Sequence, residues 1–205
     1  MVQKKNRLPI VLSGTAVALF LGLMTYALQH DPNALPSQLV NRAAPLFSAS
    51  VAQGGQFALQ EHVGKGRWLV LNFWTTTCVV CREEAPELQR FYQDVSSQGG
   101  AAPQFVSINT QESTPEILGY LRDLHLSYPV ISDKSGKISL DYGVYGTPET
   151  FFIDPQGRVR HRVAGEVDKD SILRFIDFLQ KNPEISAAQA IHGFAQVRSG
   201  VGGSL

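Results

Sequence analysis

Apolar residues recur along the chain in short runs and in helical stripes. Trp68 to Trp74 is a nearly continuous apolar run bounded by turn residues, which is typical of a buried central strand. Phe105 to Asn109 repeats this pattern, and the stretch from Val79 to about Val95 between them has helical spacing. Two such strands joined by a helix predict a right-handed parallel βαβ unit.

The rest of the chain predicts further elements of both kinds. In chain order they are a possible strand at Gln56 to Gln60, a helix from Thr114 to about Leu124, an extended piece from Tyr128 to Ile131, a weak helix from Ser135 to Tyr142, strands at Thr150 to Asp154 and Arg158 to Val163, and an amphipathic helix from Asp168 to Leu179. We therefore predict an α/β fold, with a mixed central sheet flanked by helices on both faces.

The amino-terminal segment differs from the rest of the chain. Lys4, Lys5 and Arg7 precede an uncharged run from Leu8 to Leu28, which matches the roughly 20 residues that a membrane-spanning helix needs. The basic flank is expected to stay cytoplasmic, so that the rest of the chain is exported. The length of the run favours an uncleaved anchor. A weak small-x-small site at residues 25–27 leaves a cleaved signal peptide as the alternative.

These patterns divide the chain into four parts. Residues 1–30 are predicted to form a cytoplasmic amino terminus and a membrane anchor, and residues 31–45, which contain prolines, a tether. The globular domain is expected to span residues 46–182. Residues 183–205 are rich in Ala, Gly and Ser, and this composition predicts a disordered tail.

Composition narrows the classes of function. The 205 residues include 18 basic and 18 acidic side chains, so no basic excess favours a nucleic-acid partner. The two cysteines are too few for a disulfide framework or a four-ligand structural zinc site, and the five histidines are scattered. We expect neither a metal nor a cofactor.

The candidate chemistry lies in Cys78-Val79-Val80-Cys81, between a predicted strand and a predicted helix. A helix amino terminus favours a thiolate, so the pKa of Cys78 should lie below the usual value of about 8.5. Cys78 is the expected nucleophile, and Cys81, one turn into the helix, the resolving thiol. A structural disulfide is the alternative, but a bridge across so short a loop constrains the unfolded chain little. The pair therefore indicates thiol–disulfide exchange.

The sequence around this pair resembles the thioredoxin superfamily. The Trp68–Trp74 strand, the two cysteines and Pro86 match the strand, active site and helix-kinking proline of that superfamily. The block from Gly143 to Asp154, Gly-Val-Tyr-Gly-Thr-Pro-Glu-Thr-Phe-Phe-Ile-Asp, is similar to the signature of the thiol:disulfide interchange proteins of cytochrome c maturation, the CcmG/DsbE group. The anchor and the tether resemble that group too. The resemblance implies a thioredoxin-like fold.

The resemblance also implies a biological setting. Members of the group are anchored in the inner (cytoplasmic) membrane by a single span, and their redox domain faces the periplasm. They take electrons from a membrane donor of the DsbD/CcdA type and reduce the disulfide of apocytochrome c, or of a cytochrome c maturation thiol protein. The resemblance further implies that the Thr147–Pro148 bond is cis, and that Pro148 belongs to a loop that faces the cysteines and pairs with the client backbone.

Two positions depart from the pattern of the family. Thr77 stands where family members commonly have Trp, which changes the docking surface. Asn72 stands where thioredoxin has a buried Asp, and an amide cannot accept a proton at physiological pH. Another group must then help to move the proton of Cys81. The resemblance makes Glu84 and Glu149 the candidates, although acidic residues near a helix amino terminus are common for electrostatic reasons alone.

The sequence alone leaves several interpretations of the function open. The protein could be a general exported reductant with another client, an oxidant or isomerase with a more oxidising potential, or a module that binds apocytochrome without electron transfer. The identity of the client would distinguish a general reductant, and the reduction potential would distinguish an oxidant or isomerase. A binding module would be distinguished by whether function needs the cysteines.

Overall fold

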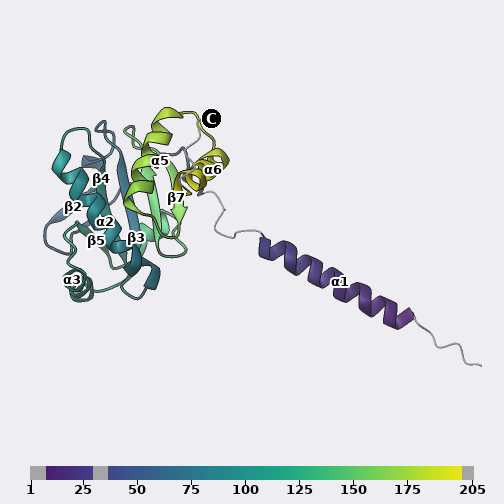
Figure 1. Ribbon diagram of the computed structural model, residues 1–205. Coiled ribbons are helices and arrows are strands. Elements are labelled where there is room, and N and C mark those ends of the chain that lie inside the picture. Colours follow the sequence, from purple (N-terminus) through teal and green to yellow (C-terminus); the bar gives the residue numbers. More distant parts are fainter. Residues whose placement is uncertain (1–7, 30–36, 200–205) are drawn as a thin grey trace, which may run out of the picture. The chain divides into compact units, whose positions relative to one another are not determined.

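The computed structural model describes residues 8–29 and 37–199 (Figure 1). Residues 8–29 form one helix, α1 (Leu8–Gln29), and belong to a unit separate from the rest of the chain. The elements of the second unit are β1 (Ser48–Ser50), β2 (Gln56–Ala58), the 3-10 turn η2 (Leu59–Glu61), β3 (Leu69–Trp74), α2 (Val79–Gln98), β4 (Gln104–Thr110), α3 (Thr114–Asp123), β5 (Val130–Asp133), α4 (Lys137–Asp141), β6 (Glu149–Ile153), β7 (Val159–Ala164), α5 (Lys169–Lys181) and α6 (Ala187–Arg198).

Five strands form the central sheet in the order β5-β4-β3-β6-β7. β3, β4 and β5 run parallel to one another, whereas β6 pairs antiparallel with β3 and with β7. The predicted βαβ unit, the closing hairpin and the mixed sheet are all confirmed. In addition, β1 and β2 form a separate two-stranded antiparallel ribbon. Because β3 lies at the centre of the sheet, the loop that follows it starts from a strand held on both sides.

Alternation along β3 assigns its side chains to the two faces of the sheet. Leu69, Leu71 and Phe73 join one core cluster, which α4 and the segment around β2 cover. Trp68, Val70 and Trp74 join the other, which α2, α3, α5 and α6 cover. The prediction of helices on both faces is therefore confirmed. Asn72 has the parity of the second set, so a polar side chain faces α2 inside an apolar layer.

The expectation of a disordered tail is wrong for residues 183–199. Residues 187–198 form α6, which begins with a capping box at Ser186 and packs on α5 and β7. Ala190 and Phe194 are buried, and the Phe194 ring meets the Phe175 ring edge to face at 5.1 Å. Gly193 permits this close packing, since an added Cβ would lie 2.3 Å from the Phe178 ring. Residues 200–205 lie outside the described part of the chain.

The expectation of a tether is wrong for its second half. Asn41 N donates to Val159 O at 2.7 Å, Val159 N donates to Arg42 O at 2.8 Å, and Ala43 forms a bridge with Arg158. Ala44 is buried in the core. Residues 37–45 thus belong to the domain, because they pair with the start of β7. Residues 31–36 of the predicted tether lie outside the described residues.

Among residues 8–29 and 37–199, no helix is both long enough and apolar enough to cross a membrane. The membrane anchor predicted from the sequence is therefore not confirmed.

Candidate active site

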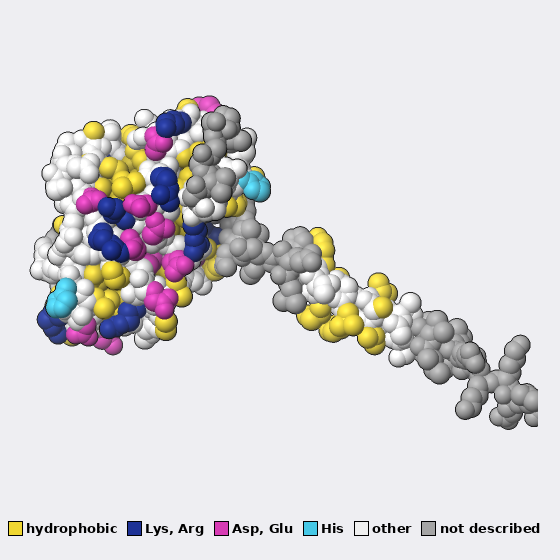
Figure 2. Space-filling model, viewed as in Figure 1, with side chains coloured by type: hydrophobic (Ala, Val, Ile, Leu, Met, Phe, Trp, Pro, Cys, Tyr) yellow, Lys and Arg dark blue, Asp and Glu magenta, His cyan; other side chains and the backbone are white. Residues whose placement is uncertain are grey.

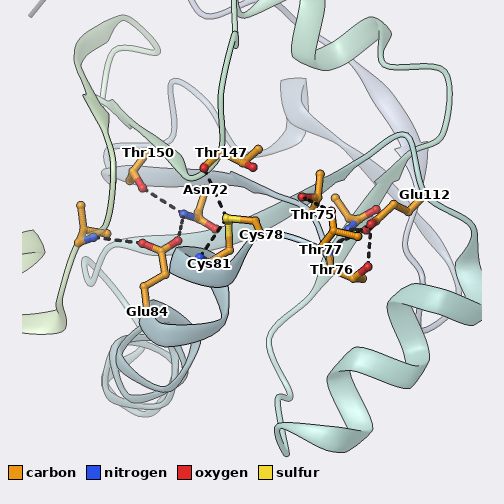
Figure 3. Close-up of a disulfide and its surroundings, with 12 residues drawn as sticks. Asn72, Thr75, Thr76, Thr77, Cys78, Cys81, Glu84, Glu112, Thr147 and Thr150 are labelled. Carbon is orange, nitrogen blue, oxygen red and sulfur yellow. Dashed lines mark hydrogen bonds between the residues drawn. A yellow bond between two sulfur atoms is a disulfide. The ribbon is translucent and has the colours of Figure 1, made fainter. Parts of the chain in front are cut away.

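The two cysteines lie at the junction of β3 and α2, as predicted, and they are joined in a disulfide (Figure 3). Cys78 is the residue that caps the amino terminus of α2, and its Sγ accepts a hydrogen bond from Cys81 N at 3.0 Å. Cys78 is half-buried, whereas Cys81 is only 2% exposed. The accessible sulfur therefore stands at the positive end of the helix dipole, and the shielded sulfur one turn behind it.

The loop before β6 faces the disulfide. The Thr147–Pro148 peptide bond is cis, which confirms what the family resemblance implied. The carbonyl oxygen of Thr147 lies 3.4 Å from Cys78 Sγ (Figure 3). This segment is thus in place to contact any chain that is joined to Cys78.

Glu84 lies on α2, one turn beyond Cys81, and is only 3% exposed. Asn72 Nδ2 donates to one carboxyl oxygen at 2.9 Å, and Val167 N donates to the other at 3.1 Å. Burial raises the pKa of Glu84 from 4.5 to about 8, against the opposing effect of these two hydrogen bonds. A carboxyl group that titrates near neutral pH can both accept and release a proton during turnover.

Asn72 links the sheet to this carboxyl group. Its Nδ2 also donates to Thr150 Oγ1 at 3.1 Å, so that β3, α2 and β6 meet in one buried polar cluster (Figure 3). Asn72 Oδ1 has no hydrogen-bond partner among the described residues. The amide thus supports Glu84 without titrating itself.

Glu149 occupies a different place from Glu84. It follows Pro148 at the start of β6 and is 1% exposed. Its Oε1 accepts from Tyr145 N at 3.2 Å and from Gly146 N at 3.3 Å, and its Oε2 lies 3.4 Å from Arg162 Nη1. Burial raises the pKa of Glu149, although Arg162 opposes the shift. These contacts hold the loop before Pro148 rather than either cysteine.

Glu112, whose role the sequence alone did not indicate, holds the loop before Cys78. Its carboxylate accepts from Thr76 N at 2.8 and 3.0 Å and from the Thr76 hydroxyl at 2.7 Å, and Asn109 Nδ2 donates to it at 2.5 Å (Figure 3). Glu112 follows the end of β4, next to β3 in the sheet. The carboxyl ends of parallel strands meet at one edge, so its position was a usable signal.

Exposed apolar side chains lie between the two cysteines and along a cavity that Thr147 lines. Val79, Val80, Leu140 and Tyr145 are exposed to between 40% and 77%. Leu140 and Tyr145 belong to the lining of a cavity of about 440 Å³, which also includes Thr110, Gln111, Ser139 and Thr147. Thr147 lines this cavity and its carbonyl faces Cys78, so this residue connects the cavity with the reactive sulfur.

Comparisons with known proteins agree with this geometry. Residues 40–162 match the model of the AhpC/TSA family. A thiol:disulfide interchange protein DsbE of Pseudomonas aeruginosa is 39% identical over 155 residues, which cover 75% of this chain and 79% of the relative. This chain belongs to the AhpC/TSA family and to the DsbE group. HelX of Rhodobacter capsulatus, also a thiol:disulfide interchange protein, is 31% identical over 160 residues, 77% of this chain and 87% of the relative.

A solved structure extends the likeness to the fold. The crystal structure of a putative DsbE from Chlorobium tepidum superposes with a TM-score of 0.58 at 26% identity, and covers 66% of this chain and 94% of its own. The DsbE-group protein therefore has the thioredoxin-like fold that the resemblance implied. With its Cys78–Cys81 pair, it is a thiol–disulfide oxidoreductase.

Proposed function

We propose that this DsbE-group protein reduces the disulfide of apocytochrome c, or of its thiol partner protein, during cytochrome c maturation. The observation that carries the proposal is the half-buried sulfur of Cys78, on a rim formed by the Thr147 carbonyl and the exposed side chains of Val79 and Val80. An unfolded chain could lie along this rim and present a sulfur to Cys78. The resemblance of the block from Gly143 to Asp154 to the cytochrome c maturation group supplies the direction and the client.

The proposed reaction is two successive thiol–disulfide exchanges. The thiolate of Cys78 attacks one sulfur of the client disulfide, so that a mixed disulfide forms and the other client sulfur leaves as a thiolate. The thiolate of Cys81 then attacks Cys78 Sγ, which releases the second client sulfur and closes the Cys78–Cys81 bond. The client gains two electrons and the enzyme loses two. The disulfide in the structure corresponds to the enzyme after this transfer.

Glu84 is the proposed proton acceptor for Cys81. The buried thiol must lose its proton before it attacks, and Glu84 stands one turn away on the same helix with a pKa of about 8. Pro148 and the Thr147 carbonyl are proposed to hold the client backbone. For Glu149 we propose an indirect part through the loop that it binds, because it contacts Tyr145, Gly146 and Arg162.

The proposed setting of the reaction is the periplasmic side of the inner membrane. The enzyme would regain two electrons from a membrane donor of the DsbD/CcdA type. The uncharged run from Leu8 to Leu28 and the basic residues before it support a single anchor. In α1 the exposed side chains include Val17, Leu19, Phe20, Leu21, Leu23 and Met24 (Figure 2). Alkaline extraction of membranes tests the anchor: a full-length chain found in the soluble fraction would rule it out.

The decisive test of function combines a reduction potential with a cellular assay. Equilibration of the full-length protein with dithiothreitol or glutathione should give a potential near or below about −270 mV, as for thioredoxin, whereas a value near −120 mV would indicate an oxidant. Cells with Cys78→Ala should lack c-type cytochromes. If Cys78→Ala together with Cys81→Ala still supports them, the protein acts as a binding module. Normal cytochromes combined with a low potential would indicate a general reductant with another client.

A further inference from the structure

Tyr145 is an exposed aromatic side chain that is nevertheless held in place. It is 59% exposed and lines the same cavity as Thr147, whose carbonyl faces Cys78. Its hydroxyl oxygen accepts a hydrogen bond from Arg162 Nη2 at 3.0 Å, and the Arg162 guanidinium carbon lies 4.6 Å from the centre of its ring. An exposed tyrosine would ordinarily move between rotamers, and these two contacts fix one of them.

Arg162 holds the same loop by a second route. It points from β7 toward Glu149 at the start of β6, and the two charged groups lie 3.4 Å apart with side chains 4% and 1% exposed. Glu149 in turn accepts hydrogen bonds from the backbone of Tyr145 and Gly146. Arg162 therefore contacts both Glu149, which holds the loop backbone, and the side chain of Tyr145. Together the three residues fix the backbone of the loop and the Tyr145 ring.

A buried ion pair is poor evidence of a gain in stability, because the loss of hydration can exceed the attraction between the charges. The presence of the Arg162–Glu149 pair at this position is better explained by the way it orients the neighbouring loop. The planar guanidinium binds the carboxylate, the hydroxyl and the ring face at once, which a lysine ammonium cannot do. The loop that it fixes also contains Thr147, whose carbonyl faces Cys78.

We propose that Arg162 is a positioning residue for client binding: through Glu149 and Tyr145 it holds the loop of residues 145–148 so that the Tyr145 ring contacts the polypeptide joined to Cys78. The proposal rests on the proposed function in that the client is an extended polypeptide disulfide. A small disulfide that does not reach the cavity needs Cys78 but not Tyr145, so Arg162 is expected to affect the two kinds of substrate differently.

The test compares substrates across matched variants of the full-length protein. The variants are Tyr145→Phe, Tyr145→Leu, Arg162→Lys and the double variant Tyr145→Leu with Arg162→Lys. Arg160→Lys is the control, because Arg160 is likewise buried on β7 but contacts Asp154 and the Pro183 carbonyl. Second-order rate constants are measured by stopped flow for the disulfide of a Cys-x-x-Cys-His peptide, for insulin and for oxidised glutathione.

Arg162→Lys and Tyr145→Leu should each slow reduction of the peptide about five- to tenfold, while the rate with glutathione changes less than about twofold. The double variant should lose less than the two single losses combined, because part of the effect of Arg162 passes through Tyr145. Tyr145→Phe should lose less than Tyr145→Leu, since it keeps the ring. Arg160→Lys should leave the ratio of the two rates unchanged.

Two results would overturn the proposal. The first is a ratio of peptide to glutathione rates that is the same in the wild type and all variants, and the second is an additive loss in the double variant. If the wild type reduces insulin and glutathione but not the peptide, the proposed client is wrong, and the same comparisons on insulin decide the role of Arg162. Because Tyr145 is exposed, Tyr145→Leu gives a result even if Arg162→Lys does not fold.

Discussion

The carboxyl group of Glu84 should make the stability of the protein depend on pH in a specific direction. Its pKa is raised from 4.5 to about 8 in the folded state, so between these values the folded state holds a proton that the unfolded state has lost. The contribution of Glu84 to stability is then fully present below pH 4.5 and is lost as the pH rises through 8. At about 1.4 kcal/mol per pKa unit, the total loss is on the order of 5 kcal/mol.

Glu84→Gln removes this titration with little change in shape. The carboxyl group now accepts from Asn72 Nδ2 and Val167 N, and the new amide would keep an acceptor for one of them. Asn72 can rotate its amide so that the free Oδ1 accepts from the new NH2 group. We expect the variant to be as stable as the wild type, within about 1–2 kcal/mol, near pH 5, and more stable by several kcal/mol above pH 8.

The assay is denaturant unfolding of the oxidised protein at pH 5, 7 and 9, followed by the fluorescence of the buried Trp68 and Trp74. Glu83→Gln is the matched control, since Glu83 is the neighbouring acid on α2 and is exposed. In parallel, quenched-flow mass spectrometry gives the lifetime of the mixed disulfide between Cys78 and a peptide. Loss of the proton acceptor should lengthen that lifetime about 10²-fold or more at pH 7.

The titration of Glu84 and its role as proton acceptor for Cys81 can be refuted separately. Parallel losses of stability in the wild type and Glu84→Gln from pH 5 to pH 9 would show that the carboxyl group does not titrate as its burial requires. An unchanged lifetime of the mixed disulfide would show that another group, or water, takes the proton of Cys81. The Glu83→Gln control should leave both measurements as in the wild type.

Three further predictions follow from particular contacts. Glu112→Gln should reduce stability by about 1–3 kcal/mol and slow all disulfide substrates alike, because the charged acceptor for the backbone and hydroxyl of Thr76 is lost; unfolding and stopped-flow rates check this. Burial lowers the pKa of His161 from 6.5 to about 4, so stability should fall by about 3 kcal/mol as the pH drops from 6.5 to 4, and His161→Phe should flatten that part of the profile. Gly193→Ala should loosen α6 and cost about 1–3 kcal/mol through the clash with Phe178, seen as faster amide exchange in α6 without loss of the redox reaction.

Local patterns were enough to predict most of the sheet. The apolar run from Trp68 to Trp74 and its repeat at Phe105 to Asn109 became β3 and β4, because central parallel strands are buried on both faces. The cysteines were found for the same reason: a strand that ends before a helix places them at the helix amino terminus. Their difference in exposure follows from the helical turn that separates them.

Contacts between distant parts of the chain were not predictable in the same way. The stripe of α6 uses Ala190 and Phe194 in a segment whose Ala and Gly content resembles a disordered tail, and only the surface of α5 and β7 turns it into a packed helix. Glu112 and Arg162 bind partners that lie elsewhere in the chain: Glu112 binds Thr76, and Arg162 binds Glu149. The charged side chains of β7 were visible in the sequence, but the role of Arg162 depends on its partners Glu149 and Tyr145.

The order of the loop of residues 75–77 lowers the entropic cost of binding a client. The Glu112 carboxylate fixes Thr76 in the free protein, so the segment before Cys78 is already ordered when a client arrives. Association ordinarily costs about 0.5–1.5 kcal/mol for each flexible side chain that becomes immobile, and this part of the cost is removed on the enzyme side. The adaptation needed for the two sulfurs to align must then come from the client. A rigid partner of this kind selects for clients whose disulfide lies in an unfolded, pliable chain and against those whose disulfide is locked in a folded domain.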